Sequence, residues 1–149
     1  MAGRNEVERI IEIVPFAVAE READITLYTT DASAAYSTLD PERSPVRGIA
    51  AFRAAAVVHA TSLDAWLSCR PELAPRVRCI KTDVQGAESR VLAGMSRTLL
   101  PTGVTIVCET TIGTDADVML ERAGFRRHRI ARGISPHGNF LYVRPSLPV

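Results

Sequence analysis

The stretch "RVRCIKTDVQGAESRVLAGMSRTLL", residues 76–100, contains the pattern of a strand, a turn and a helix in direct succession. Its first part, residues 76–83, is short, carries Val77, Cys79 and Ile80 and stops at an acid, which predicts a strand. From residue 87 to 100, apolar side chains recur at helical spacing and predict one apolar helix face, formed by Val91, Leu92, Met95 and Leu99. A strand followed at once by a helix is the repeating unit of α/β proteins.

The same unit recurs downstream. Residues 104–109, "VTIVCE", predict an almost entirely apolar strand, and residues 115–125 predict a helix that Thr114 and Asp117 start together. Gly124 is placed to end this helix in a left-handed conformation, with Phe125 folding back onto it. Residues 125–130 and 139–144 then predict two strands of an antiparallel hairpin across a turn rich in Gly, Pro and Asn.

Before residue 76 the signals are less regular. Residues 10–18, "IIEIVPFAV", predict a buried strand because they are mostly apolar and β-branched. Period-2 alternation predicts a strand at 24–30, a loop is expected at 31–48, and 54–60 predict a short strand. A helix over 61–67 would follow, with Thr61 and Asp64 as its capping pair.

Together these elements predict an α/β fold in a single domain of residues 1–149. Residues 10–60 form its strand and long-loop part, and residues 61–149 form its α/β part with the C-terminal hairpin. We expect a mostly parallel, Rossmann-like sheet with both faces covered and an antiparallel edge.

Composition excludes several classes of partner and site. The formal net charge of +1 and the ordinary 46% apolar content favour neither nucleic acid nor a membrane as partner. The three cysteines, Cys69, Cys79 and Cys108, lack metal-type spacing, and two of them lie in apolar runs. This usage indicates a reducing, cytoplasmic compartment with Cys79 and Cys108 buried, and no metal site is expected.

Two predicted strands end in acids, Asp83 and Glu109. Ligands of open parallel sheets bind at the carboxyl ends of the strands, and neighbouring strands lie about 5 Å apart. The two carboxylates can therefore share a cation, or one can take a proton from a substrate hydroxyl. The alternative is structural: Asp83 starts a turn, and Glu88 in the first helical turn favours the helix dipole.

Five motifs in order resemble the carboxyl-terminal part of the FkbM-type methyltransferases, which use S-adenosylmethionine and a Rossmann-like fold. They are "TSLDAWL", "IKTDVQGAESRVLAGMSRTLL", "VTIVCE", "MLERAGFRRHRI" and "GNFLYVRP". The resemblance implies methylation of a hydroxyl on a small molecule or sugar. It matches Asp83, Glu88 and Glu109 to the family's acids, and Ala17 and Val18 to a strand end near the adenine of the cofactor.

The chain also departs from the family pattern. Thr82 replaces a branched aliphatic residue, and Gln85 stands where glutamate is common. The nine glycines never form Gly-x-Gly, and the family's first strand with its glycine-rich loop is absent, as is the next strand. In such folds these two strands lie between the strands matching 10–18 and 76–83. We therefore expect a sheet that is incomplete on its amino-terminal side and a chain impaired in catalysis.

The absence of these two strands also suggests a second class of function. An unpaired sheet edge can bind another chain, so the alternative is a non-catalytic α/β module that binds a partner, including a second copy as a homodimer.

Overall fold

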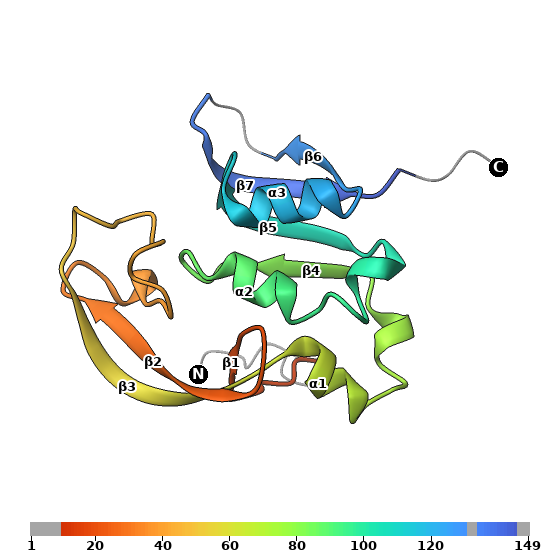
Figure 1. Ribbon diagram of the computed structural model, residues 1–149, viewed down its shortest axis with the longest axis horizontal. Coiled ribbons are helices and arrows are strands. Elements are labelled where there is room, and N and C mark those ends of the chain that lie inside the picture. Colours follow the sequence, from red (N-terminus) through yellow and green to blue (C-terminus); the bar gives the residue numbers. More distant parts are fainter. Residues whose placement is uncertain (1–9, 131–133, 146–149) are drawn as a thin grey trace, which may run out of the picture.

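The computed structural model describes residues 10–130 and 134–145, which form two mixed β-sheets and three short α-helices (Figure 1). The first sheet has the order β1-β3-β2, with β1 at Ala17–Val18, β2 at Ala23–Thr30 and β3 at Phe52–Thr61. β2 and β3 are antiparallel and form a long ribbon, whereas β1 runs parallel to the end of β3. The helix α1, Leu63–Ser68, follows this ribbon directly.

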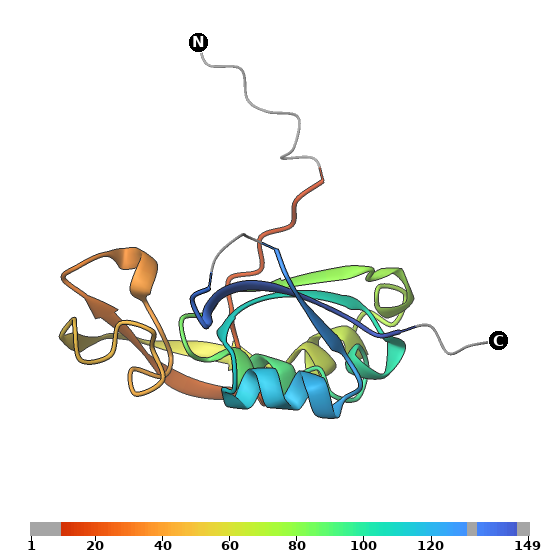
Figure 2. The ribbon, with the colours of Figure 1, turned by 90° about the horizontal axis from the view of Figure 1, so that it is seen from above.

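The second sheet has the order β4-β5-β7-β6. Its strands are β4 at Cys79–Thr82, β5 at Thr105–Thr111, β6 at Arg126–Arg129 and β7 at His137–Val143. β4 and β5 are parallel, and β7 pairs antiparallel with both β5 and β6. The helices α2, Glu88–Ala93, and α3, Asp115–Arg122, lie on one side of this sheet (Figure 2).

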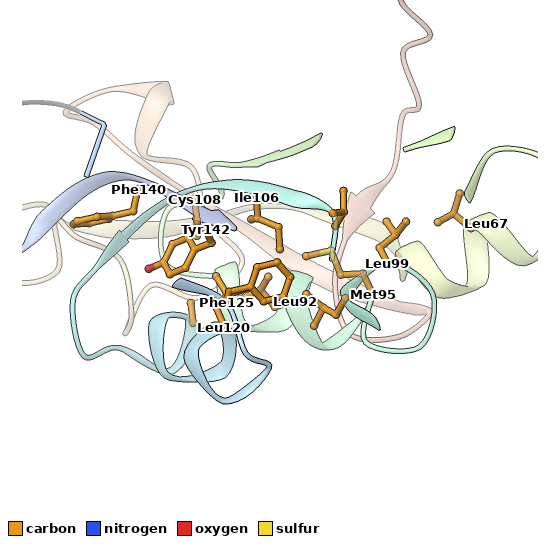
Figure 3. Packing of buried hydrophobic residues seen from close by; sticks show 13 residues of the cluster. Leu67, Leu92, Met95, Leu99, Ile106, Cys108, Leu120, Phe125, Phe140 and Tyr142 are labelled. Carbon is orange, nitrogen blue, oxygen red and sulfur yellow. The ribbon is translucent and has the colours of Figure 1, made fainter. Parts of the chain in front are cut away.

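The buried core lies between this sheet and its helices (Figure 3). Alternate residues of β5 and β7 point into it, as the period of two in a strand requires. They meet apolar side chains from α2, α3 and the turns that follow them. The largest members that are fully buried are Leu92, Met95, Ile106, Leu120, Phe140 and Tyr142.

The structure confirms the α/β class and the antiparallel hairpin of β6 and β7. The expected mostly parallel sheet, covered on both faces, is wrong for the described residues. Of the strand pairings that they form, β1–β3 and β4–β5 are parallel and the other three are antiparallel. On the face away from the helices, Val107 and Leu141 remain partly exposed, because nothing in the described chain packs over them.

The predicted buried strand at residues 10–18 is also wrong. Hydrogen-bonded pairing begins only at Ala17, and Ile10 and Ile13 are 83% and 86% exposed. An apolar, β-branched sequence forms a buried strand only where a neighbour offers both a backbone partner and a surface. The described residues offer neither to residues 10–15, whereas Ala17 and Val18 pair with the end of β3.

Local signals were more reliable at one helix end than at the others. Gly124 has φ +86°, and the N–H groups of Gly124 and Phe125 donate to the carbonyls of Glu121 and Leu120, so the predicted cap is confirmed. The helix predicted over 87–100 instead ends at Ala93. A side chain on the next residue, Gly94, would lie 2.1 Å from the Ala19 carbonyl oxygen, so the chain there is closely packed.

The predicted capping pair of α1 is wrong. Ser62, not Thr61, caps this helix by accepting from the Ala65 N–H at 3.1 Å. Asp64 is buried and accepts hydrogen bonds from the backbone N–H groups of Arg97 and Thr98, at 3.1 and 2.9 Å. It therefore fixes the turn after α2 against α1.

Two further local predictions are corrected by tertiary contacts. Cys79 is exposed, because alternate residues of β4 face away from the core, whereas Cys108 is buried as expected. Thr114 occupies the N-cap of α3 without a side-chain cap bond. Asp117 is buried and accepts from the Gly113 N–H at 2.8 Å and from the Tyr142 hydroxyl at 2.7 Å.

Candidate functional site

A cleft of about 260 Å³ lies at the carboxyl ends of the parallel strands β4 and β5. This is the sheet edge at which open α/β folds bind ligands. Its walls come from the loop before β3, the turn after β4, the end of β5, the start of α3 and the start of β7. The polar side chains that line it are Arg43, Gln85, Glu88, Ser89, Glu109, Thr110, Thr111, Thr114, Asp115 and His137.

The turn after β4 is held by Glu88. This residue begins α2, as the sequence predicted, and its carboxylate is buried. It accepts the backbone N–H of Val84 at 3.2 Å and that of Gly86 at 3.1 Å. Glu88 therefore shapes the floor of the cleft, and its lone pairs are engaged by the backbone.

Gly86 meets the opposite wall of the cleft. Both Gln85 and Gly86 adopt positive φ, +53° and +105°. A Cβ on Gly86 would lie 2.5 Å from the backbone carbonyl of Arg43. The turn and the loop around Arg43 are thus in backbone contact, and glycine is required at this position.

Asp83 lies beside the cleft rather than in its lining. Its side chain is 44% exposed, and its carboxylate contacts Lys81 Nζ at 3.2 Å and accepts from Gln85 Nε2 at 2.8 Å. Partial burial acts to raise the pKa of Asp83, but the interactions with Lys81 and Gln85 outweigh it and hold the pKa below its usual value. The register of β4 and β5 pairs Thr82 with Cys108, so the residues that follow them, Asp83 and Glu109, lie side by side at the sheet edge, as sheet geometry predicted.

Glu109 lines the cleft and meets a histidine that the sequence did not single out. The Glu109 carboxylate lies 3.3 Å from His137 Nε2, and His137 Nδ1 lies 3.1 Å from the Thr111 hydroxyl. The antiparallel register of β5 and β7 pairs Thr111 with His137 and so creates this contact. Only the strand pairing could have identified His137, because it stands alone in a turn-like sequence.

Arg43 closes the other side of the cleft. It belongs to the long loop that the sequence assigned to residues 31–48, and it contacts the first residues of α2 and α3. Its guanidinium pairs with Asp115 at the start of α3 and lies 3.4 Å from both the Asp40 carboxylate and the Ser89 hydroxyl. Two carboxylates neutralise this arginine, so it offers a bound molecule little free positive charge.

Ala17 and Val18, matched by the resemblance to the adenine side of a cofactor site, do not reach the cleft. They form β1 and pair with Ala60 and Thr61 in the other sheet. Neither lines a hollow identified among the described residues. The structure therefore assembles the three acids of the predicted site and leaves these two residues apart from them.

Within residues 10–130 and 134–145, no group of three or more His, Cys, Asp or Glu side chains is arranged to hold a metal ion. No helix in the same ranges is long and apolar enough to cross a membrane. No protein-family model, curated protein or solved structure matches the chain.

The side chains that line the cleft suit a neutral, hydroxyl-rich molecule. The lining combines the hydroxyls of Ser89, Thr110, Thr111 and Thr114 with carboxylates that can accept hydrogen bonds. A substrate hydroxyl can donate to the Glu109 carboxylate and accept from a neighbouring threonine. An anionic ligand would meet the acids Glu109 and Asp115 with Arg43 already paired, which is unfavourable.

Proposed function

We propose that this chain supplies the acceptor-binding side of a Rossmann-like, S-adenosylmethionine-dependent methyltransferase of the FkbM type. The acceptor is a small molecule or sugar that carries a hydroxyl. The observation that supports this most is the position of the cleft at the carboxyl ends of β4 and β5, where Glu88 and Glu109 line it and Asp83 lies beside it.

The carboxylates have different roles in this proposal. Glu109 receives a hydrogen bond from a second hydroxyl of the acceptor and orients the molecule, with His137 fixing the carboxylate. Asp83 lies next to Glu109 and is the base that accepts the hydroxyl proton. Glu88 keeps the turn in shape and takes no part in proton transfer, because backbone N–H groups occupy it.

The described residues do not fit a complete cofactor site. Ala17 and Val18 line neither the cleft nor the hollow beside α2 and α3, and one edge of β4 has no neighbouring strand among the described residues. The resemblance places two further strands, one with a glycine-rich loop, at this edge. We therefore expect the 149-residue chain to bind an acceptor hydroxyl and to be impaired or inactive in methyl transfer.

Two binding measurements test the proposal. Isothermal calorimetry of the chain with S-adenosylmethionine should show no tight, stoichiometric binding; such binding would contradict the expected incomplete cofactor site. Two-dimensional NMR with methyl glucoside and with catechol should shift the amides of Ser89, Glu109 and His137. If neither probe moves these amides at millimolar concentration, the cleft is not an acceptor site.

Substitution of the acids then assigns their roles. Glu109→Gln should weaken binding of whichever probe binds by about tenfold, since a hydrogen bond to a charged group contributes about 1.5–3 kcal/mol. Glu72→Gln is the matched control, because Glu72 is an exposed acid outside the cleft. Equal affinities for the two variants would remove Glu109 from the site.

A further inference from the structure

An apolar segment of the chain, residues 10–15, lies outside the folded body, and the next residue, Phe16, packs edge-on against His59 of β3. The segment leads away from both sheets, as Figure 2 shows, and its side chains are largely exposed. The exposed fractions of its isoleucines and of Phe16 are Ile10 83%, Ile11 59%, Ile13 86% and Phe16 46%. Four exposed large apolar side chains within seven residues are a feature of a binding surface.

The sequence of this segment has the character of a strand. Ile10, Ile11, Ile13 and Val14 are β-branched, and residues 10–14 contain neither glycine nor proline. The segment is therefore suited to join a sheet, and the described chain gives it no neighbouring strand.

β4 offers such a neighbour. In the part of the chain that the structure describes, β4 pairs with β5 on one side only. Along its other edge the backbone N–H and C=O groups face no strand and can pair with an added one. Cys79 and Lys81 point outwards, whereas Thr82 is buried and Ile80 packs against the core.

Apolar and polar side chains alternate along residues 11–13 in a way that fits the alternation of core-facing and outward-facing side chains along β4. If Glu12 lies beside Lys81, then Ile11 and Ile13 fall on the same face as Ile80 and Thr82, because successive residues of a strand point to opposite faces. Ile11 and Ile13 would then extend the core, and Glu12 and Lys81 would pair at the surface. This charge complementarity distinguishes the segment from a second β4, which would bring Lys81 and Arg78 close to their own counterparts.

We propose that two copies of this chain exchange their amino-terminal segments, so that residues 10–14 of each copy add a strand to the free edge of β4 in the other. Exchange between copies fits the geometry because residues 17–18 are held in β1, in the other sheet, and the segment leads outwards from there. Such an exchange is a closed two-fold arrangement, with the Glu12–Lys81 contact occurring twice. The edge is the one at which the proposed function expects further strands, and the exchange covers it in the 149-residue chain.

Charge reversal tests the arrangement. Sedimentation equilibrium of the 149-residue chain should show a dimer, and both Glu12→Lys and Lys81→Glu should weaken it by about tenfold or more. The double variant, with the charges swapped, should recover most of the affinity. Glu22→Lys is the matched control, because Glu22 is an exposed acid outside the segment and β4. A monomeric wild-type chain, or a dimer that tolerates both single reversals, overturns the proposal.

Cross-linking locates the contact. Cys79 is exposed on β4, so a cysteine introduced at Ile10 lies opposite it if the added strand is parallel, and one at Val14 if it is antiparallel. Under mild oxidation, one of the variants Ile10→Cys and Val14→Cys should give a covalent dimer that Cys79→Ser abolishes. Failure of both, or a cross-link confined to a single chain, refutes the exchange without bearing on the acceptor cleft.

Circular dichroism separates loss of the dimer from loss of the fold. Glu12 is exposed in the segment, and Lys81 makes a half-exposed ion pair with Asp83, so neither reversal removes core packing. The single variants should therefore keep the far-ultraviolet spectrum of the wild-type chain. Loss of that spectrum would contradict the exposed placement of these side chains on which the exchange depends.

Discussion

Replacement of Gly86 by alanine is expected to separate the two walls of the cleft. Gly86 has φ +105°, and an added Cβ would lie 2.5 Å from the Arg43 carbonyl and 2.7 Å from the Ser44 nitrogen. Both neighbours are backbone atoms, so no side-chain rotation relieves the overlap. Either the turn after β4 or the loop around Arg43 has to move.

Two effects contribute to the loss of unfolding free energy in Gly86→Ala. A left-handed conformation costs a non-glycine residue about 1–2 kcal/mol. Forcing extra volume into a packed site costs about 1–3 kcal/mol more. The Gly86→Ala variant should therefore lose about 2–5 kcal/mol of unfolding free energy.

Gly48→Ala isolates the contact. Gly48 lies in the same long loop with φ +79°, and an added Cβ there would meet nothing within 4 Å. This control carries the backbone cost alone, about 1–2 kcal/mol. The difference between the variants, about 1–3 kcal/mol, then measures the Gly86–Arg43 contact.

Urea denaturation gives the unfolding free energies, and amide hydrogen exchange shows where the strain is released. If the loop detaches instead of the whole fold weakening, the Arg43 and Arg47 amides should exchange faster in Gly86→Ala. The reasoning is refuted if Gly86→Ala and Gly48→Ala agree within about 0.5 kcal/mol and the loop amides exchange as in the wild-type chain.

Asp117→Asn should cost about 3 kcal/mol at pH 7, because it breaks a buried acid–arginine pair with Arg127. Burial acts to raise the pKa of Asp117, but hydrogen bonds from Gly113, Tyr142 and Arg127 outweigh it, so the pKa is lower in the folded chain than in the unfolded one. The stabilisation from this carboxylate is therefore full at neutral pH and is lost as pH falls through the folded-state pKa. Urea titrations from pH 7 to pH 3 should show a smaller loss for Asp117→Asn than for the wild-type chain, and parallel curves would contradict this role. A thiol reagent should modify two cysteines in the native chain, Cys69 and Cys79. Cys108 should react only on unfolding, because burial raises its pKa to about 12, and rapid modification of all three thiols would argue against the buried position of β5.

Much of the second sheet was predictable from the sequence because its signals are local. An almost entirely apolar run predicted β5, two strand-like runs across a turn rich in Gly, Pro and Asn predicted the hairpin that contains β7, and Thr114 with Asp117 predicted the start of α3. Gly124 marked the end of α3. The acids Asp83 and Glu109 were identified as neighbours because two strands joined by one helical connection tend to lie side by side.

Other features depend on contacts between residues far apart in the chain. Asp64 looked like a cap until the turn at 97–98 provided its hydrogen-bond donors. Arg43 reaches the cleft because its loop packs on Gly86, and His137 reaches Glu109 through the pairing of β5 with β7. No pattern within a short window specifies such partners.

Residues 10–16 show most clearly the difference between what a local sequence pattern determines and what contacts with the rest of the chain determine. The sequence determined that this segment is apolar and suited to a strand. Only the tertiary structure decided that it is exposed, because a strand also needs an edge that pairs with it and a face that covers it. Side-chain patterns fix what a segment can form, whereas burial depends on which surfaces the rest of the chain brings to it.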